Sequence, residues 1–245
     1  MAYLWDQLRA AVPLIFSGTS EILTTTWITL RIALVSTGIA LIVGLPIGLV
    51  IGLGRFRGRR VLHILANASL ALPPVLAGVF VLLVLLPQGP LGSLHFAFSI
   101  YGVYAVQTLL ALPYIVAMTP AAIQALPPGL LAQARTLGAG PLQLSALALR
   151  EAKIGVIAAI IAALGTALSE VAAIIIVGAN IQGDTQTLAT AIVSQIYDYG
   201  NYPAALAIGV VLLVLILALM LVLTVLQQRT SGVRLRFRTS GATGG

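Results

Sequence analysis

The chain has 245 residues, of which 60% are hydrophobic and only 8% are charged, whereas a soluble globular domain carries about 25% charged residues. With a mean hydropathy of +1.08, most of its surface would be apolar, and we expect that surface to face lipid rather than water. The net charge is +7, but the cations gather at the ends of apolar runs, which is typical of membrane topology and not of a nucleic-acid-binding face. Because the chain has no cysteine, disulfides, thiolate metal sites and cysteine nucleophiles are excluded.

Five apolar segments are long enough to cross a hydrocarbon layer of about 30 Å as helices. They cover residues 27–53, 61–86, 100–118, 154–177 and 204–225. These runs are apolar on every face and lack the alternation of barrel strands, so helices are the expected way to satisfy the backbone in lipid. Residues 8–20, which contain Pro13 and Gly18, are too short to span and predict an interfacial helix. The sequence therefore predicts an all-α, polytopic protein with one membrane domain over residues 1–228 and a disordered tail over 229–245.

The basic residues predict the orientation, because Lys and Arg are retained on the cytoplasmic side during insertion. One side holds Arg55, Arg57, Arg59, Arg60, Arg135, Arg150, Lys153, Arg229, Arg234, Arg236 and Arg238. The other side offers only Arg9, beside Asp6, Glu21, Asp184 and Asp198. We therefore expect the N-terminus outside the cell and the C-terminus in the cytoplasm. The expected location is the inner membrane.

The connection over residues 120–153 is long and retains a helical pattern, and connections of this length usually have a function. Gly138 and Pro141 predict a corner between two short helices, since glycine accepts a left-handed cap and proline begins a helix well. Such a corner makes a knob that can enter a groove on another protein.

This connection resembles the coupling loop of the membrane-spanning subunits of ABC importers, which has an alanine-rich first helix, a fixed glycine and a second helix that enters the membrane. The matching residues are Ala132, Gln133, Ala134, Arg135, Thr136, Leu137, Gly138 and Ala139. The acidic residue at the start of the family motif is missing, and Arg150 and Glu151 replace its Leu-Pro ending. The resemblance implies the fold of a type I importer permease, with residues 130–153 docking on a separate ATP-hydrolysing subunit.

Other segments narrow the resemblance to permeases of tungstate importers, with molybdate permeases as close relatives. These segments are residues 149–152, 169–173, 177–181 and 185–192. The resemblance covers residues 20–228 and implies a permease for an oxyanion that an external binding protein delivers. Because an odd number of spans gives no internal inverted repeat, we expect symmetry to come from a second copy, as a homodimer.

Two charged residues fall within the predicted spans. An ionised group there costs at least ~2.5 kcal/mol on insertion scales, so Glu170 is expected to face protein or water. Arg31 and Glu170 lie roughly 6 and 10 Å from the outer ends of their predicted helices. We expect them to pair, either as a structural neutralisation or at the border of the translocation path.

Hydroxyl and amide donors suit an oxyanion path, because carboxylates repel a dianion. The candidates are Asn67, Ser69, Gln107, Thr108, Thr166 and Ser169. Small hydroxyl residues also allow close helix packing, and this alternative stays open for each of them. Pro73 and Pro74 are expected to break the second span as a gate element, and Pro46 and Pro113 to interrupt the first and third, although kinks are common in membrane helices.

The loop over residues 178–203 is polar and aromatic and is expected outside. Its candidates for docking a binding protein are Asn180, Gln182, Asp184, Tyr197 and Tyr199, since tyrosine is frequent in protein interfaces. Alternatively, the tyrosines mark the membrane boundary.

Missing motifs exclude other functions. The chain has no Gly-x-x-x-x-Gly-Lys-Ser/Thr phosphate loop, so it is not expected to hydrolyse ATP or to be an enzyme. His63 and His95 have no partners at ligand spacing, and we expect neither a metal nor a cofactor. The expected partners are an ATPase subunit, an external binding protein, a second copy and lipid, but not nucleic acid. An ion-coupled secondary transporter of a small anion is the alternative, which would need buried carboxylates besides Glu170.

Overall fold

The computed structural model describes residues 2–16 and 20–231, with side chains placed for residues 5–15 and 20–228. All regular elements in these ranges are helices, which confirms the predicted all-α class. In chain order they are α1 (Ala2–Phe16), α2 (Ser20–Leu53), α3 (Arg59–Ala68), η1 (Ser69–Ala71), α4 (Pro74–Leu85), η2 (Gly92–Leu94), α5 (Ile100–Gln124), α6 (Leu130–Thr136), α7 (Pro141–Glu151), α8 (Lys153–Ser169), α9 (Ala172–Gly178), α10 (Leu188–Tyr197) and α11 (Tyr202–Ser231).

Three of these helices, α2, α5 and α11, are long and apolar enough to cross a membrane. Two further candidates are bent pairs: α3 with η1 meets α4 at 101°, and α7 meets α8 at 71°. The described part of the chain thus contains three to five candidate spans, in agreement with a polytopic membrane protein. The segment over residues 61–86 breaks at Pro73 and Pro74, as predicted. The segment over residues 154–177 was predicted as one uninterrupted span, and this is wrong, because α8 ends at Ser169 and the chain resumes as α9 at Ala172.

The prolines affect their helices differently. Leu72 and Pro73 have extended backbones, with ψ of 120° and 124°, and Pro74 begins α4, as expected because a residue that precedes proline is disfavoured in the α region. By contrast, α2 continues through Pro46, and α5 continues through Pro113. Neither helix ends at its proline, since a single proline inside a packed membrane helix removes one backbone bond without ending the helix, and the expected kinks at Pro46 and Pro113 stay a prediction.

The centre of the fold is the contact between α2 and α5. Three glycines of α2, Gly44, Gly48 and Gly52, lie four residues apart on the face toward α5. A Cβ atom at Gly48 would lie 2.7 Å from the Cβ of Thr119. Small residues at this spacing let two membrane helices approach closely, and α8 packs against both α5 and α2.

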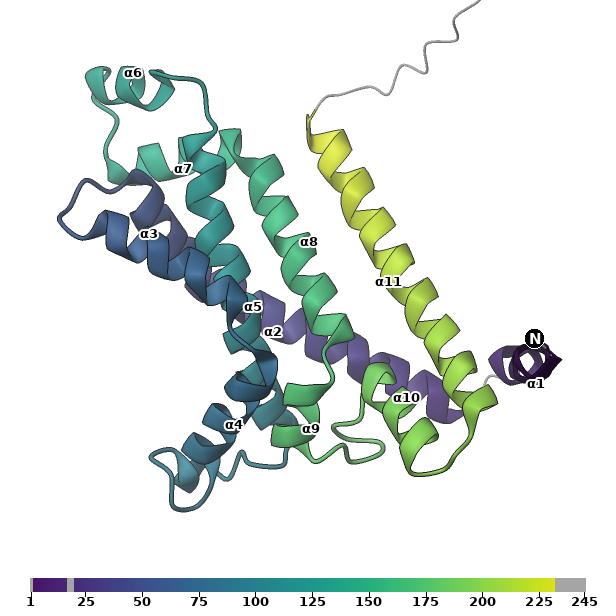
Figure 1. Cartoon of the computed structure of the whole chain (residues 1–245). Helices are drawn as coiled ribbons and strands as arrows, with labels where there is room; N and C mark the ends of the chain where they lie inside the picture. Colours follow the sequence, from purple (N-terminus) through teal and green to yellow (C-terminus); the bar gives the residue numbers. More distant parts are fainter. Residues whose placement is uncertain (1, 17–19, 232–245) are drawn as a thin grey trace, which may run out of the picture.

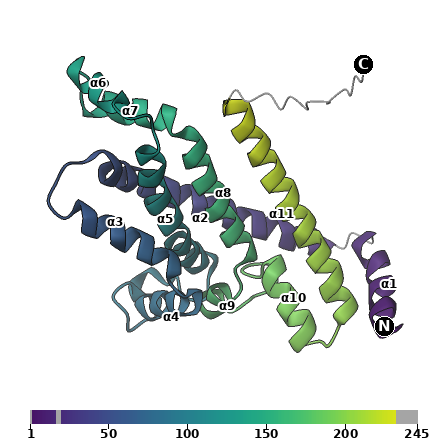
Figure 2. The ribbon, with the colours of Figure 1, turned by 45° about the horizontal axis from the view of Figure 1, so that its top comes forward.

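The helices connect two ends of the molecule. One end carries α6, α7 and the end of α11, and the opposite end carries α9, α10 and the loop after α4 (Figure 1). The turned view keeps this arrangement and shows α1 beside the first half of α11 (Figure 2). We call the first end the basic end, because it holds the side chains of Arg55, Arg57, Arg59, Arg60, Arg135, Arg150 and Lys153.

Both chain ends differ from prediction in their bounds. The helix expected over residues 8–20 begins earlier, at Ala2, and is described to Phe16, while residues 17–19 lie outside the described residues. The predicted tail begins later than residue 229, because α11 continues to Ser231. Residues 232–245 lie outside the described part of the chain.

Candidate functional site

The most exposed feature of the basic end is the corner between α6 and α7, which we call the coupling knob (residues 130–151). Gly129 and Gly138 have φ of +88° and +86°, a left-handed conformation that glycine adopts without the strain of a Cβ atom. Pro141 then begins α7, so the two short helices and the corner are as predicted. Leu137 and Leu142 are 88% and 86% exposed, and the knob therefore offers an apolar tip.

The coupling knob is tied to the spanning helices. Arg135 Nη2 donates to the carbonyl of Leu53 at the end of α2, at 3.4 Å. Ala148 of α7 is buried in one apolar cluster with Ile123 of α5 and with Ala152. The knob therefore contacts both α2 and α5. Of the predicted docking residues, Ala132, Gln133, Thr136, Leu137 and Gly138 are exposed, and Ala134, Arg135 and Ala139 are partly buried.

A second site lies at the bend between η1 and α4, and we call it the bend cavity. It has a volume of about 290 Å³. Its lining includes four of the predicted path residues, Ser69, Pro73, Pro74 and Thr166, together with Leu110, Pro113 and Tyr114 of α5. None of the lining residues is charged. The bend thus brings residues that are far apart in the sequence to one carboxylate-free space with three hydroxyl groups, those of Ser69, Tyr114 and Thr166.

The hydroxyl groups of the bend cavity are held by their own helices. Ser69 Oγ donates to the carbonyl of Ala66 at 2.7 Å, and Thr166 Oγ1 donates to that of Ala162 at 3.1 Å. A hydroxyl has a single proton, so donation to a bound anion would replace the bond to the helix carbonyl. Tyr114 was missed by the sequence analysis, although a tyrosine in the middle of an apolar span is a signal that could have found it.

The other donor candidates do not line the bend cavity. Gln107 is buried, with Nε2 3.5 Å from the carbonyl of Ala167, and Thr108 Oγ1 donates to the carbonyl of Ser36 at 3.4 Å. These two side chains join α5 to α8 and to α2. Their contacts agree with the alternative that they serve helix packing and not the anion path. Ser169 is exposed and bonds within its own helix, and Asn67 contacts His63.

The predicted pairing of Arg31 with Glu170 is wrong. Glu170 is 8% exposed, and its Oε1 accepts the backbone N–H of Ala173, at 3.0 Å, at the start of α9. Arg31 instead lies over the ring of Tyr104, 5.8 Å from its centroid, in a cation–π contact. The prediction assumed a continuous fourth helix, whereas the chain breaks at Glu170 and offers backbone N–H groups to the carboxylate.

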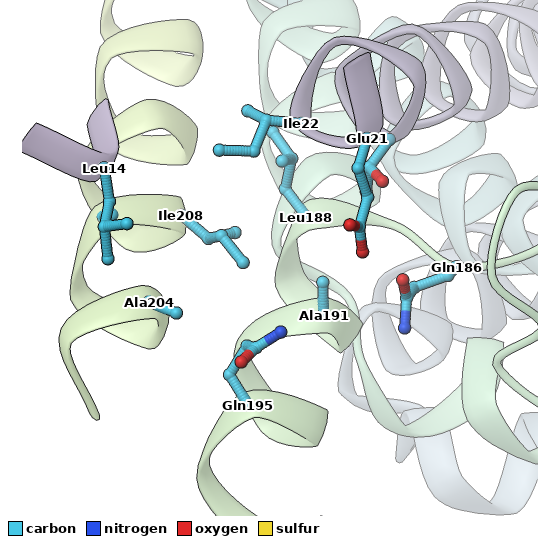
Figure 3. Close-up of a pocket in the computed structure, with 11 residues that line it drawn as sticks. Leu14, Glu21, Ile22, Gln186, Leu188, Ala191, Gln195, Ala204 and Ile208 are labelled. Atoms are coloured by element: carbon cyan, nitrogen blue, oxygen red, sulfur yellow. The ribbon is translucent and has the colours of Figure 1, made fainter. Parts of the chain in front are cut away.

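At the opposite end, a pocket of about 150 Å³ lies between α2, α10 and α11. Figure 3 shows Glu21, Gln186 and Gln195 directed toward its centre from separate segments, with Ile22, Leu188 and Ile208 as an apolar wall. An adjoining polar recess of about 270 Å³ shares the three polar residues. We call the two together the outer pocket.

Only part of the predicted docking set reaches the outer pocket. Gln182 and Tyr199 line the recess, and Gln182 Nε2 donates to Glu21 Oε1. Asn180 Nδ2 donates to Ser194 Oγ at 2.8 Å and holds the loop on α10, while Asp184 and Tyr197 are exposed outside the pocket. Glu21 was missed, because the sequence analysis used it only as a topological charge.

Residues 44–232 match the family described as the binding-protein-dependent transport system inner membrane component. The chain belongs to this family. The permease is 34% identical to a probable anion ABC transporter permease protein of Haloferax volcanii, over 89% of its own length and 92% of that protein. It is 31% identical to the tungstate uptake system permease protein TupB of Peptoclostridium acidaminophilum, over 93% of its length and 100% of the relative.

A solved structure has the same fold. The bacterial ABC transporter involved in the import of the acidic polysaccharide alginate matches with a TM-score of 0.71 at 17% identity, covering 89% of the permease and 82% of that chain. The predicted type I importer-permease fold is confirmed, and so is the family that the coupling-loop motif implied. The permease is therefore a multi-pass inner-membrane transport component.

Proposed function

We propose that this permease forms the membrane path of an ATP-driven importer for a tetrahedral oxyanion such as tungstate or molybdate. The likeness to the tungstate permease over 93% of the chain is the observation that carries the proposal. The bend cavity supports it, because its lining offers hydroxyl groups and no carboxylate, and a dianion is stabilised by donors and repelled by fixed negative charge.

The proposed partners dock at opposite ends. The apolar tip of the coupling knob, with residues 132–139, suits a groove on a separate ATPase subunit, and hydrolysis of ATP belongs to that subunit. The outer pocket and the exposed Tyr197 and Tyr199 suit an external binding protein that delivers the anion. The basic end lies in the cytoplasm and the N-terminus outside, because arginines concentrate at that end. A second copy completes the path as a homodimer.

In the proposed mechanism the ATPase moves the coupling knob, and the knob moves the helices. Arg135 joins the knob to the end of α2, and α7 packs on α5 and α8. Both α5 and α8 line the bend cavity, so its exposure to either side of the membrane changes when the knob moves. An ion-coupled secondary transporter is not favoured, since Glu170, the acid within the predicted spans, is held by the backbone of α9.

The proposal predicts that Thr166→Val slows tungstate uptake. The change removes a hydroxyl from the bend cavity and keeps the side-chain shape, and loss of a hydrogen bond to a charged group corresponds to about a tenfold effect. Uptake of radiolabelled tungstate is measured in proteoliposomes that hold the permease with its ATPase and binding protein. Thr24→Val is the matched control, because Thr24 also donates to its own helix but lies outside the cavity.

Uptake by Thr166→Val at the control rate would contradict the placement of the path at the bend cavity. Transport of neither tungstate nor molybdate by the unchanged complex would contradict the proposed cargo.

A further inference from the structure

An open cavity at the basic end is separate from the coupling knob and the bend cavity. It has a volume of about 620 Å³ and is lined by Arg59, Arg60, His63, Ile64 and Gln124. We call it the basic cavity. The first four residues come from α3, and Gln124 is the last residue of α5, so the cavity lies between two helices that diverge from it.

Arg59 is held in place by two hydrogen bonds and keeps further N–H groups unused. Its Nε donates to the carbonyl of Ile51 at 2.7 Å, and its Nη2 donates to that of Gly52 at 2.9 Å. A guanidinium has five N–H donors, and these two bonds leave three. The side chain is thus preorganised by the end of α2, where its charge also suits the helix dipole, while its other donors stay available. The neighbouring Arg60 is exposed.

His63 forms a polar wall of the cavity. Its Nδ1 lies 3.0 Å from Asn67 Nδ2, and its Nε2 lies 3.2 Å from Gln124 Nε2. A neutral imidazole has one N–H and one acceptor nitrogen, so at least one of the two amides must present its oxygen to the ring. That amide then directs its own NH₂ group away from the ring. Of the two amides, Gln124 lines the cavity and places its NH₂ group beside the two arginines, whereas Asn67 lies outside the lining.

The charge around the cavity has one sign. The cavity lining contains two arginines and no carboxylate. Among the side chains described at the basic end, Glu151 is the one acid beside Arg55, Arg57, Arg59, Arg60, Arg135, Arg150 and Lys153. Paired guanidinium groups with amide donors are the chemistry that recognises phosphate and similar oxyanions. A cationic ligand does not fit this lining.

We propose that the basic cavity binds a tetrahedral oxyanion, either as a free anion or as the phosphate group of an anionic phospholipid. The site is distinct from the path, because none of its lining residues lines the bend cavity. A bound anion would bridge α3 to the end of α5. In the chain, α3 is followed by the bend of the bend cavity, and α5 is followed by the coupling knob. A bound anion would therefore restrict the movement of these two segments relative to each other during transport. This consequence rests on the proposed function, whereas the binding itself does not.

Binding is tested with the full-length chain in nanodiscs of phosphatidylcholine, with tungstate and inorganic phosphate as probes in equilibrium dialysis. Arg60→Gln is expected to weaken binding of at least one probe by about tenfold, the size of a lost charge-assisted hydrogen bond. Arg57→Gln is the matched control, because Arg57 is exposed in the adjacent loop, carries the same charge and lies outside the lining. Its affinity is expected to stay within twofold of the unchanged chain.

Gln124→Leu provides a second variant that keeps every charge. It is expected to weaken binding several-fold, because an amide donor is lost while the field of the basic end is unchanged. Both variants are compared in thermal midpoint with the unchanged chain, so that unfolding is recognised.

A second arm identifies the source of the anion. Native mass spectrometry of chains from membranes of mixed phosphatidylglycerol and phosphatidylcholine counts the retained anionic lipids. Tungstate or phosphate binding in phosphatidylcholine assigns the cavity to a free anion. Loss of one phosphatidylglycerol in Arg60→Gln but not in Arg57→Gln, without free-anion binding, assigns it to a lipid phosphate.

Equal weakening by Arg57→Gln and Arg60→Gln would overturn the proposal, since a general surface charge would then explain the binding. Absence of an Arg60-dependent difference in both arms would overturn it as well. A failure of the proposed transport function can be distinguished from a failure of anion binding at the basic cavity, because uptake is measured with the unchanged complex and does not involve these variants.

Discussion

Single glycines decide how closely the two central helices approach. Gly44, Gly48 and Gly52 of α2 face Ile115, Thr119 and Ile123 of α5, and a Cβ at Gly48 or Gly52 would come within 2.7 Å of the facing side chain. In lipid, helix association depends on such packing rather than on a hydrophobic force. The small residues of this stripe are therefore expected to carry much of the stability of the fold.

We expect Gly48→Ala to lower the thermal unfolding midpoint in detergent, because the added methyl group overpacks the contact with Thr119, at a typical cost of about 1–3 kcal/mol. Gly38→Ala is the control on the same helix, since its Cβ would meet nothing within 4 Å and alanine is the better helix former. A midpoint of Gly48→Ala equal to or above that of Gly38→Ala would show that the glycine stripe is not a close contact.

For single residues, the sequence predicted whether a side chain is buried better than it predicted which group that side chain contacts. The expectation that Glu170 faces protein is consistent with its burial, but its partner is a backbone N–H and not Arg31. The break after Ser169 contains neither proline nor glycine, so no local signal marked it. The contact between His63 and Gln124 joins residues 61 positions apart and depends on the bend before α4, which a sequence alone does not place in space.

Among the described elements, the coupling knob presents the most exposed large apolar side chain. Leu137 is 88% exposed at its corner, and an apolar side chain so exposed on a short, well-anchored element is expected to be buried by another protein. Apolar residues at the centre of an interface commonly contribute 2 kcal/mol or more to binding.

Leu137→Asp is therefore expected to weaken association with the ATPase subunit by at least about tenfold, while membrane insertion and thermal midpoint stay unchanged. The association is measured by co-purification and by biolayer interferometry of the ATPase on immobilised permease. The control is Leu94→Asp, the same change at the opposite end, where the side chain is 47% exposed. Unimpaired assembly of Leu137→Asp would count against docking at the knob.

The elements also show which helix breaks a sequence reveals. Two consecutive prolines remove two backbone donors and force the preceding residues into an extended conformation, so the break at Pro73 and Pro74 was predictable. Pro46 and Pro113 are isolated, and their helices continue, because the surrounding helices support the backbone. The glycine corner at Gly138 was predictable for a similar reason, since its positive φ requires a residue without a Cβ atom.

The described part of the molecule has an asymmetry of charge between its two ends. The basic end carries the coupling knob and the basic cavity, while the opposite end carries the outer pocket with Glu21. The position of the arginines and the coupling-loop motif predicted this division and the family from the sequence. The bend cavity was not predictable as a space, because it exists only after η1, α5 and α8 pack together.

We propose that the permease conducts its anion only when a separate ATPase drives it. The most direct measurement is uptake of radiolabelled tungstate into proteoliposomes that contain either the permease alone or the permease with its ATPase and binding protein, with and without ATP. We expect accumulation only in the complete system with ATP, and none with the permease alone under any ion gradient. Accumulation of tungstate by the permease alone, driven by an ion gradient, would contradict it.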